Sequence, residues 1–242
     1  MFKTKGIVLR TVKYGETSLV VTIFTELFGV QTYMVNGVRS SKSRSSKANY
    51  FLPAAILDME VYHHEQKNMQ RLKEFSWAVL YRQVLGDVIK NSIALYFMEL
   101  LHKCLKQPEK NTDLFSFCED VLLQLDNAAP AAAANFPLYF ALNLPQFFGF
   151  RINDNYSEAA TILDLHEGTF EETMPRHPHF IDGDAAYITS QLLKVMHPDE
   201  LEQVRLNQQE RRKLLLQFQD YYALHIPEFG QMKTLSVLHE VL

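Results

Sequence analysis

The sequence has very little cysteine, with only Cys104 and Cys118 among its 242 residues. They do not form a CxxC pair, and both lie in apolar segments with helical spacing. We therefore expect two buried free thiols rather than a disulfide or a metal site. No apolar run reaches the roughly 18 residues that a membrane-spanning helix needs, and the first residues lack the apolar stretch of a signal peptide. These absences favour a cytoplasmic protein.

Motifs of the common enzyme classes are also missing. The sequence contains no GxxxxGK[ST], no GxGxxG after a strand, no GxSxG and no HExxH. The serines between residues 36 and 51 have no histidine near them in the sequence, and nothing indicates a catalytic triad assembled from distant residues. We therefore expect no enzyme activity.

One short segment, HPHFIDGD, contains residue types that can bind a metal ion. His177, His179, Asp182 and Asp184 could supply nitrogen and oxygen ligands. The proline and the glycine in the same segment are more typical of an ordinary turn, and no cysteine takes part. We expect no bound metal and no other cofactor.

Charge is distributed unevenly along the chain. Residues 1–80 carry 11 Lys or Arg and 6 Asp or Glu, whereas residues 81–242 carry 13 and 22. Apolar residues make up 47% of the chain, which is enough for a buried core. A basic first part followed by an acidic second part predicts two domains with different partners.

The first 80 residues have the pattern of a small β-barrel. Their runs are rich in β-branched residues and are separated by turn-sized connections, except for one longer connection after the third run. The predicted strands are residues 4–14, 18–26, 30–37, 54–64 and 69–79. Five strands in this length are typical of the OB-fold.

From residue 81 onward, apolar residues recur at spacings of three and four, which predicts helices. The predicted helices include residues 84–105, a segment from 112, 138–150 with a break at Pro145, 186–196, 198–206, 209–225 and 233–242. Residues 151–185 are rich in turn formers and acids, contain short strand-like pieces such as ATILDL, and look like an insertion of irregular or hairpin structure. We therefore predict an α+β protein with an OB-fold barrel in residues 1–80 and an all-α helical domain in residues 81–242.

The long connection in the predicted barrel, NGVRSSKSRSSKANYF, carries Arg39, Lys42, Arg44 and Lys47 and no carboxylate. Such a stretch either solvates a loop or neutralises the phosphates of a nucleic acid, and the residues alone leave both open. Three basic residues of the first predicted strand could extend this stretch: Lys5, Arg10 and Lys13. Binding of this kind would be independent of sequence and sensitive to salt.

Four aromatic residues near these bases could stack on nucleotide bases. They are Tyr14, Tyr33, Tyr50 and Phe51. Strand and core packing is the more common use of such residues, so we expect most of them to be buried.

Several short motifs occur together in an order that resembles the RecO family of bacterial recombination mediators. They are GETS at residues 15–18, FTELFG at 24–29, NGVRSSKS at 36–43 and LPQFFGF at 144–150. The resemblance implies an OB-fold followed by a helical domain, binding of single- and double-stranded DNA, and annealing of complementary strands. It also implies cooperation with RecR and with the C-terminal tail of single-strand-binding protein in loading RecA. The protein would act in the cytoplasm, at the nucleoid.

The resemblance assigns roles to only some residues. Arg39 and Lys42 fall on a basic step of the family motif, whereas Arg44 and Lys47 are included for their charge and proximity. Many members of the family hold zinc with four cysteines just after the helix end that LPQFFGF at 144–150 resembles. Residues 151–185 contain no cysteine, so we expect that this zinc site is lost and that the segment is held by packing.

The acidic balance of residues 81–242 leaves a second function open. The chain could be an adaptor that binds proteins through its helical domain and contacts DNA only weakly. In some family members, arginines of that domain help to bind the tail of single-strand-binding protein. These arginines have no match here, because the corresponding stretch contains Pro137, Leu138 and Tyr139.

Overall fold

The computed structural model describes residues 1–39 and 47–242. By its internal contacts the chain forms two compact units, Met1–Asp126 and Asn127–Leu242. The first unit therefore includes two helices as well as the barrel. The predicted boundary after residue 80 marks the end of the barrel as a domain of its own. That boundary stays a prediction.

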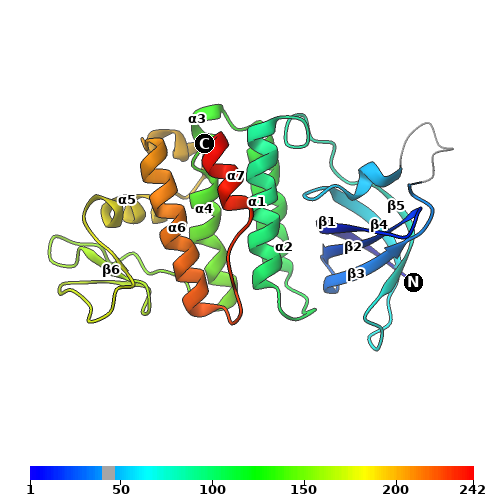
Figure 1. Ribbon diagram of the computed structural model, residues 1–242, viewed down its shortest axis with the longest axis horizontal. Helices are drawn as coiled ribbons and strands as arrows, with labels where there is room; N and C mark the ends of the chain where they lie inside the picture. The colour runs from blue at the N-terminus through cyan, green and yellow to red at the C-terminus, as the bar shows by residue number, and fades with distance from the viewer. Residues whose placement is uncertain (40–46) are drawn as a thin grey trace. The chain divides into compact units, whose positions relative to one another are not determined.

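The first unit begins with a closed five-stranded barrel (Figure 1). Its strands are β1 (Phe2–Tyr14), β2 (Ser18–Thr25), β3 (Gly29–Val35), β4 (Ile56–Tyr62) and β5 (Gln70–Trp77), and a 3-10 helix, η1 (Lys47–Phe51), precedes β4. The strand order around the barrel is β1-β2-β3-β5-β4; β3 and β5 run parallel, and the other neighbouring pairs run antiparallel. This arrangement confirms the barrel that the sequence predicts, with strand bounds close to the predicted ones.

The long strand β1 closes the barrel because it pairs with two neighbours. Residues 2–7 of β1 pair with β4, and residues 6–14 pair with β2. A register shift between Val8 and Arg10 bends the strand where it passes from one neighbour to the other. Alternate residues of all strands fill the interior, including Val21, Tyr33 and Met59.

Two helices complete the first unit: α1 (Val88–Cys104) and α2 (Thr112–Asn127). Phe115 of α2 contacts Phe24 of β2, with ring centroids 5.6 Å apart. Gly29, at the start of β3, has a φ of 62° and lies so close to the main chain of Glu109 that a Cβ there would meet the carbonyl oxygen at 2.2 Å. A glycine is therefore required at this position. Both cysteines are buried free thiols, as predicted.

Asp126 links the end of α2 to the segment that leaves the barrel. Its carboxylate accepts hydrogen bonds from the backbone amides of Arg82, Gln83 and Val84 at 2.8, 2.8 and 2.9 Å. The Nζ of Lys90 donates to the carbonyl oxygen of the same residue at 2.9 Å. Asp126 is only 6% exposed, so these bonds compensate for its burial.

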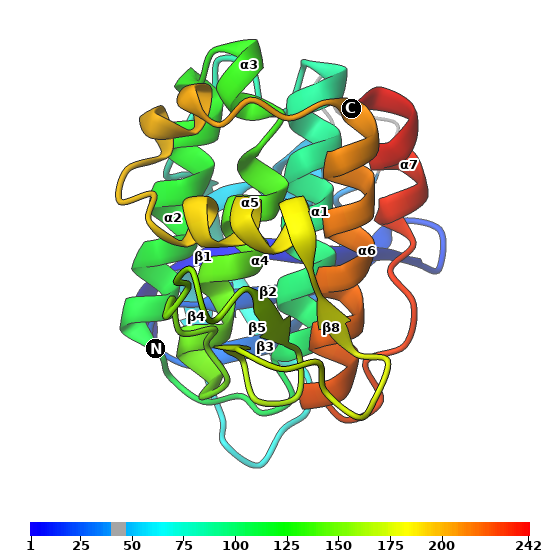
Figure 2. The same cartoon turned by 90° about the vertical axis from the view of Figure 1, so that its left-hand side faces the viewer.

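The second unit is mainly helical (Figure 2). Its helical elements are α3 (Pro130–Ala133), α4 (Phe136–Asn143), η2 (Leu144–Phe148), α5 (Gly183–Leu193), η3 (Pro198–Gln203), α6 (Gln208–His225) and α7 (Thr234–Val241). The α-helix α4 ends just before Pro145 and continues as a 3-10 helix, which confirms the predicted break. The predicted helix over 198–206 is shorter, because the chain becomes extended at Val204 before Asn207 caps α6.

The predicted insertion contains a small antiparallel sheet, which agrees with the hairpin alternative. Its strands β6 (Ile162–Asp164), β7 (Thr169–Glu171) and β8 (Phe180–Ile181) form a sheet in the order β7-β6-β8. The side chain of Asn155 both donates to and accepts from the main chain of Phe170, at 2.8 and 2.7 Å. Leu163 and Ile181 are fully buried, so packing and hydrogen bonds hold the segment.

Candidate nucleic-acid interface

The first basic residue of the stretch, Arg39, lies beside the turn that joins β1 to β2. The backbone amide of Arg39 donates to the carbonyl oxygen of Thr17 at 3.0 Å, and its Nη1 donates to the carbonyl oxygen of Gly15 at 3.1 Å. The hydroxyl of Ser18 bonds the side chain of Asn36 at 3.1 Å. These contacts fix Arg39, the first basic side chain of the stretch, beside the hairpin turn. One guanidinium nitrogen donates to Gly15, and a guanidinium has further donors that can bind a phosphate.

Lys13 and Tyr14 lie at the same end of the hairpin. Both side chains are exposed, and Tyr14 is 58% exposed. Their register partners are Leu19 and Ser18 at the start of β2. We call Lys13, Tyr14 and Arg39 the hairpin-end surface. Lys13 and Tyr14 are consecutive residues of β1, so their side chains point to opposite faces of the strand. The hairpin end thus carries two positive charges and one exposed aromatic ring, which are the kinds of group that bind single-stranded nucleic acid.

Arg10 lies on the other face of β1 from Lys13, because side chains alternate along a strand and the two residues are three positions apart. The positive charge of Arg10 instead affects His102, a residue of α1. Burial lowers the pKa of His102, and the positive charges of Arg10, Lys103 and Lys106 lower it further. The sequence did not single out Lys103 or Lys106, since lysines near the end of a helix commonly serve its carbonyl groups. Arg10 thus belongs to a second basic cluster in the same unit.

Lys47 is exposed at the first residue of η1, where the described chain resumes. This 3-10 helix is joined to β1 by a hydrogen bond from the hydroxyl of Thr11 to the carbonyl oxygen of Phe51, at 2.6 Å. Lys42 and Arg44 lie outside the described residues. Their contribution to phosphate binding stays a prediction from charge and, for Lys42, from the family motif.

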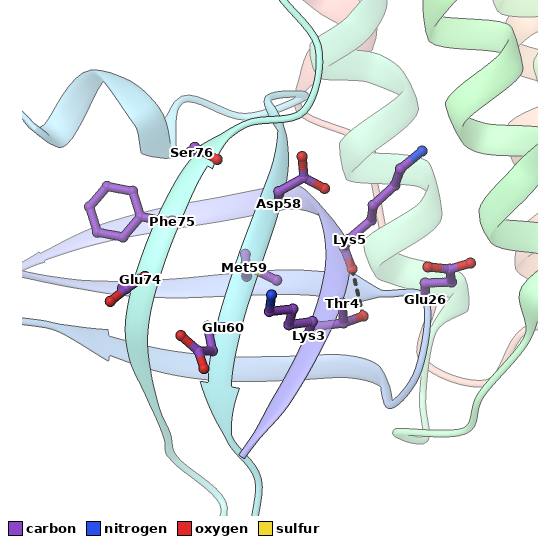
Figure 3. Close-up of a pocket in the computed structure, with 10 residues that line it drawn as sticks. All are labelled: Lys3, Thr4, Lys5, Glu26, Asp58, Met59, Glu60, Glu74, Phe75 and Ser76. Carbon is purple, nitrogen blue, oxygen red and sulfur yellow. Dashed lines mark hydrogen bonds between the residues drawn. The ribbon is translucent and has the colours of Figure 1, made fainter.

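Lys5, which is labelled on β1 in Figure 3, forms an ion pair with an acidic residue of α2. Its Nζ lies 2.7 Å from Oε1 of Glu119 on α2. The hydrogen bond to Glu119 raises the pKa of Lys5, and the charges of Asp58 and Glu26 raise it further. Because acids already compensate its charge, Lys5 has the weakest structural support among the predicted DNA contacts that the structure describes.

The four candidate stacking residues have different environments. Tyr33 is fully buried and Phe51 is 1% exposed, so both belong to the barrel core. Tyr50 is half-buried and stacks on Trp77 with ring centroids 4.9 Å apart. Tyr14 alone of the four is largely exposed. It is therefore the one whose ring is open to a nucleotide base.

The histidines considered as metal ligands lie in the second unit. His177 Nε2 lies 3.2 Å from Oδ2 of Asp164, and the imidazole of His166 lies close to that of His177, with centroids 4.3 Å apart. Asp182 occupies the N-cap position of α5. Within residues 1–39 and 47–242, no group of three or more His, Cys, Asp or Glu is placed to hold a metal ion. The expectation that the protein needs no metal stays a prediction.

In the same described ranges, none of the helices combines the length and the apolar composition that crossing a bilayer requires.

Comparison with known proteins identifies the family over nearly the whole chain. The family described as Recombination protein O N terminal matches residues 1–81, and Recombination protein O C terminal matches residues 85–234. The two matches meet near the end of the barrel strands.

Relatives that match this chain over nearly its full length are named for the same family. A protein named DNA repair protein RecO from Azobacteroides pseudotrichonymphae is 30% identical over 241 residues, covering 100% of this chain and 99% of the relative. Proteins of the same name from Bacteroides fragilis and Flavobacterium psychrophilum are 32% and 33% identical, covering 99% of this chain and 98% of each relative. The chain therefore belongs to the RecO family of DNA repair and recombination proteins.

Proposed function

We propose that this protein binds DNA through the hairpin-end surface and anneals complementary single strands without catalysing a covalent reaction. The observation that carries this is the pair of hydrogen bonds from Arg39 to the β1–β2 turn. They hold Arg39 at the end of the barrel that carries Lys13 and Tyr14. Arg39 is the first of four basic residues in a stretch that contains no acidic residue. The family match supports DNA repair as the setting.

Phosphate binding explains how such a surface would help annealing. Lys and Arg neutralise phosphates and release condensed cations, which favours binding without reference to base sequence. Two strands held on a positive surface repel each other less, so their bases meet more often. The exposed ring of Tyr14 would hold an unstacked base, which every base type permits.

We propose that the protein then helps to load recombinase onto DNA coated by single-strand-binding protein, together with RecR. It would do so in the cytoplasm, at the nucleoid, with no metal or nucleotide. The family supports these finer roles, because its members are recombination proteins.

Simultaneous charge reversal tests the DNA-binding proposal. The variant carries Arg39→Glu, Lys42→Glu and Arg44→Glu, and its control carries Lys67→Glu, Arg176→Glu and Lys213→Glu. Both variants change the net charge equally. Affinity for a fluorescent single strand is measured by anisotropy across a range of salt concentrations. If three phosphate contacts are lost, the slope of log K against log salt falls in magnitude by about 2.

The control should keep the wild-type slope to within experimental error. If the test variant binds single strands at low salt as tightly as wild type does, the basic stretch is not a DNA-binding surface. Annealing of two complementary strands, followed by a fluorescence quench, should slow in the same variant.

A groove in the second unit favours a further role as a protein-binding adaptor. It has a volume of ≈ 610 Å³ and lies between α3 and the start of α6. Apolar walls come from Pro130, Ala131 and Leu206. The charged lining consists of Arg205, Glu202 and Arg211, and Nη1 of Arg211 donates to the carbonyl oxygen of Leu206 at 2.6 Å. Arg205 is exposed. Arginines beside apolar walls suit an acidic peptide that ends in an aromatic residue, such as the tail of single-strand-binding protein.

Peptide binding tests this adaptor role. The probe is a fluorescent acidic nonapeptide that ends in Phe, and the same peptide ending in Ala is its control. Arg205→Glu should weaken binding of the Phe peptide by about tenfold, since one charge-assisted contact is lost and a repulsive one is created. If both peptides bind equally, or if Arg205→Glu changes nothing, the groove does not bind such a tail.

A further inference from the structure

A groove of ≈ 470 Å³ in the first unit lies between the start of β3 and the β4–β5 hairpin, whose turn projects from the barrel (Figure 1). Its third wall is the connection between α1 and α2. We call it the β3-edge groove. It lies at the β2–β3 turn, which is at the other end of β2 and β3 from the hairpin-end surface. Neither the DNA-binding surface nor the groove of the second unit includes it.

The edge of β3 that faces this groove has no strand beside it over its first residues. On one side β3 pairs with β2 along its whole length. On the other side, within the part of the chain that the structure describes, β3 pairs with β5 only at Tyr33 and Met34. The residues of β3 before them line the groove instead: Val30, Gln31 and Thr32. A strand edge without a neighbour presents main-chain amides and carbonyls to which another chain can bond.

The opening beside β3 is ordered by the side chain of Gln70, which is 2% exposed. Its Nε2 donates to the carbonyl oxygens of His64 and Lys67 at 2.9 and 2.7 Å, and its Oε1 accepts from the amide of His64 at 3.0 Å. These bonds hold residues 64–67 in a turn, so this part of the chain does not extend the pairing of β5 with β3. A site that is ordered before binding costs less entropy to occupy.

The wall on the α1–α2 side is fixed as well, because the main chain of Glu109 packs directly on Gly29. Gly29 is the first residue of β3, so this contact sets the distance between the connection and the free edge. Two walls of the groove are therefore held in place by specific contacts of the first unit.

Apolar side chains form part of the groove lining and are only half-buried. They include Leu27, Phe28 and Val30. The ring of Phe28 stacks on the imidazole of His63, with centroids 4.0 Å apart. Nδ1 of this imidazole is buried and has no hydrogen-bond partner among the described residues, which is unfavourable until another group bonds it. A segment lying in the groove would remove this apolar surface from water.

The charges of the lining indicate what kind of segment fits. Lys67 on the hairpin and Lys110 on the α1–α2 connection are exposed and lie on two different walls. No ion pair between described residues involves either lysine. Glu65 offsets one of the two charges, so the lining keeps a net positive charge. Acidic side chains would complement it.

We propose that the β3-edge groove binds an extended, acidic segment of a partner protein, which adds a strand to the free edge of β3. Main-chain hydrogen bonds to β3 would supply affinity, as they do wherever a peptide extends a sheet. Alternate side chains of the segment would cover Phe28 and Val30, and acidic side chains would face Lys67 and Lys110. A nucleic acid lacks the regular amides and carbonyls that pair with a strand edge, so a peptide is the better match.

The experiment uses a fluorescent ten-residue peptide of alternating Glu and Val, called the glutamate peptide. One counterpart has Lys in place of Glu, and another is N-methylated at every residue, which removes its amide donors. The test variant carries Lys67→Glu and Lys110→Glu. Its control carries Arg176→Glu and Lys213→Glu, at exposed positions of the second unit, and changes the net charge equally. Fluorescence anisotropy measures the affinity of each protein for each peptide.

We expect the glutamate peptide to bind wild type and the control variant alike. The test variant should bind it about tenfold more weakly, because two favourable charge contacts become repulsive. The lysine peptide and the N-methylated peptide should each bind wild type at least about tenfold more weakly than the glutamate peptide does. The test variant should keep its affinity for single-stranded DNA, which also shows that it is folded.

A covalent probe locates the bound peptide. Asn68→Cys places a thiol on the hairpin wall of the groove, whereas the two native cysteines are buried. A glutamate peptide with a bromoacetyl group should alkylate this thiol faster than it alkylates Glu172→Cys, at an exposed site of the second unit. Mass spectrometry follows both reactions. An excess of unmodified peptide should slow only the reaction at Asn68→Cys.

The proposal is overturned if the glutamate peptide does not bind wild type, or if it binds wild type and the test variant equally. It is also overturned if the N-methylated peptide binds as tightly as the unmodified one, since main-chain bonds to β3 would then contribute nothing. A test variant that loses affinity for single-stranded DNA while its control does not would show that the groove binds nucleic acid instead. Equal alkylation of the two cysteine variants would place the peptide elsewhere on the protein.

Discussion

Nη1 of Arg39 donates to the carbonyl oxygen of Gly15 at 3.1 Å, across the turn that joins β1 to β2. The residue is thus held by its side chain as well as by its backbone bond to Thr17. Gly15 has a φ of 57°, a left-handed conformation that glycine adopts without strain, so its carbonyl is presented by a defined turn. The guanidinium therefore has both a charge and a fixed position.

Substitutions at Arg39 separate these two properties. Arg39→Lys keeps the charge but loses the planar group that reaches Gly15 and a phosphate at once, and Arg39→Gln loses the charge. We expect single-strand affinity to fall about threefold for Arg39→Lys and about tenfold for Arg39→Gln. Fluorescence anisotropy at fixed salt measures both. Arg71→Gln, at an exposed site on β5, is the control and should bind as wild type does. Equal affinities for all four proteins would contradict this role.

Tyr14 is expected to act through its ring. Tyr14→Ala should weaken single-strand binding by about 1 to 3 kcal/mol, the usual contribution of one base stacked on an aromatic side chain. Tyr14→Phe should bind as wild type does, because the ring remains. Tyr62→Ala, which removes another exposed tyrosine of the barrel, serves as the control. Should Tyr14→Phe lose as much affinity as Tyr14→Ala, the hydroxyl rather than the ring makes the contact.

Lys5 and Lys13 should differ although both are lysines of β1. Lys13→Gln should reduce the magnitude of the salt slope for single-strand binding by about 0.7, as expected for one lost phosphate contact. Lys5→Gln should leave that slope unchanged, since Glu119 already compensates its charge. Salt titrations of the two variants provide the comparison. An equal reduction for Lys5→Gln would restore Lys5 to the DNA-binding surface.

Asp126 should stabilise the first unit. Asp126→Ala leaves one buried and two partly buried amides without their acceptor and should lower the free energy of unfolding by roughly 3 kcal/mol. Asp120→Ala, at an exposed position of the same helix, should change it by less than about 0.5 kcal/mol. Urea denaturation followed by circular dichroism measures both. A loss for Asp126→Ala no larger than that of its control would show that these bonds contribute little.

The contribution of Asp126 should also depend on pH. Burial alone would raise the pKa of this carboxyl, but hydrogen bonds from the amides of Arg82, Val84 and Gln83 and the charge of Lys90 lower it overall. A folded-state pKa below the unfolded value, about 3.9 for Asp, gives a contribution that is complete above that value and disappears as pH falls through the folded-state pKa. The difference between wild type and Asp126→Ala should therefore be constant from neutral pH down to about 5, and shrink below about 4.

Local patterns in the sequence were sufficient to predict the barrel. β-Branched runs and short turns define five strands, and each strand depends mainly on residues near it in the chain. The break at Pro145 was predictable for the same reason, since proline itself disrupts the helix.

Relationships between distant residues were not predictable in this way. The pairing of Lys5 with Glu119 joins positions 114 residues apart, and no local pattern announces it. The bulge in β1 decides how the strand divides between two neighbours, and it leaves no clear mark in the sequence. The association of α1 and α2 with the barrel unit depends on contacts such as Phe24 with Phe115.

The bonds of Asp126 to residues 82–84 have a mechanical consequence. They fasten the point where the chain enters the α1–α2 pair to the point where it leaves, so the residues between form a closed loop. Force transmitted along the chain from the second unit would pass through these hydrogen bonds to the barrel, and it would not stretch α1 or α2. The hydrogen bonds of Asp126 would therefore break first under force, and the two helices would extend only afterwards.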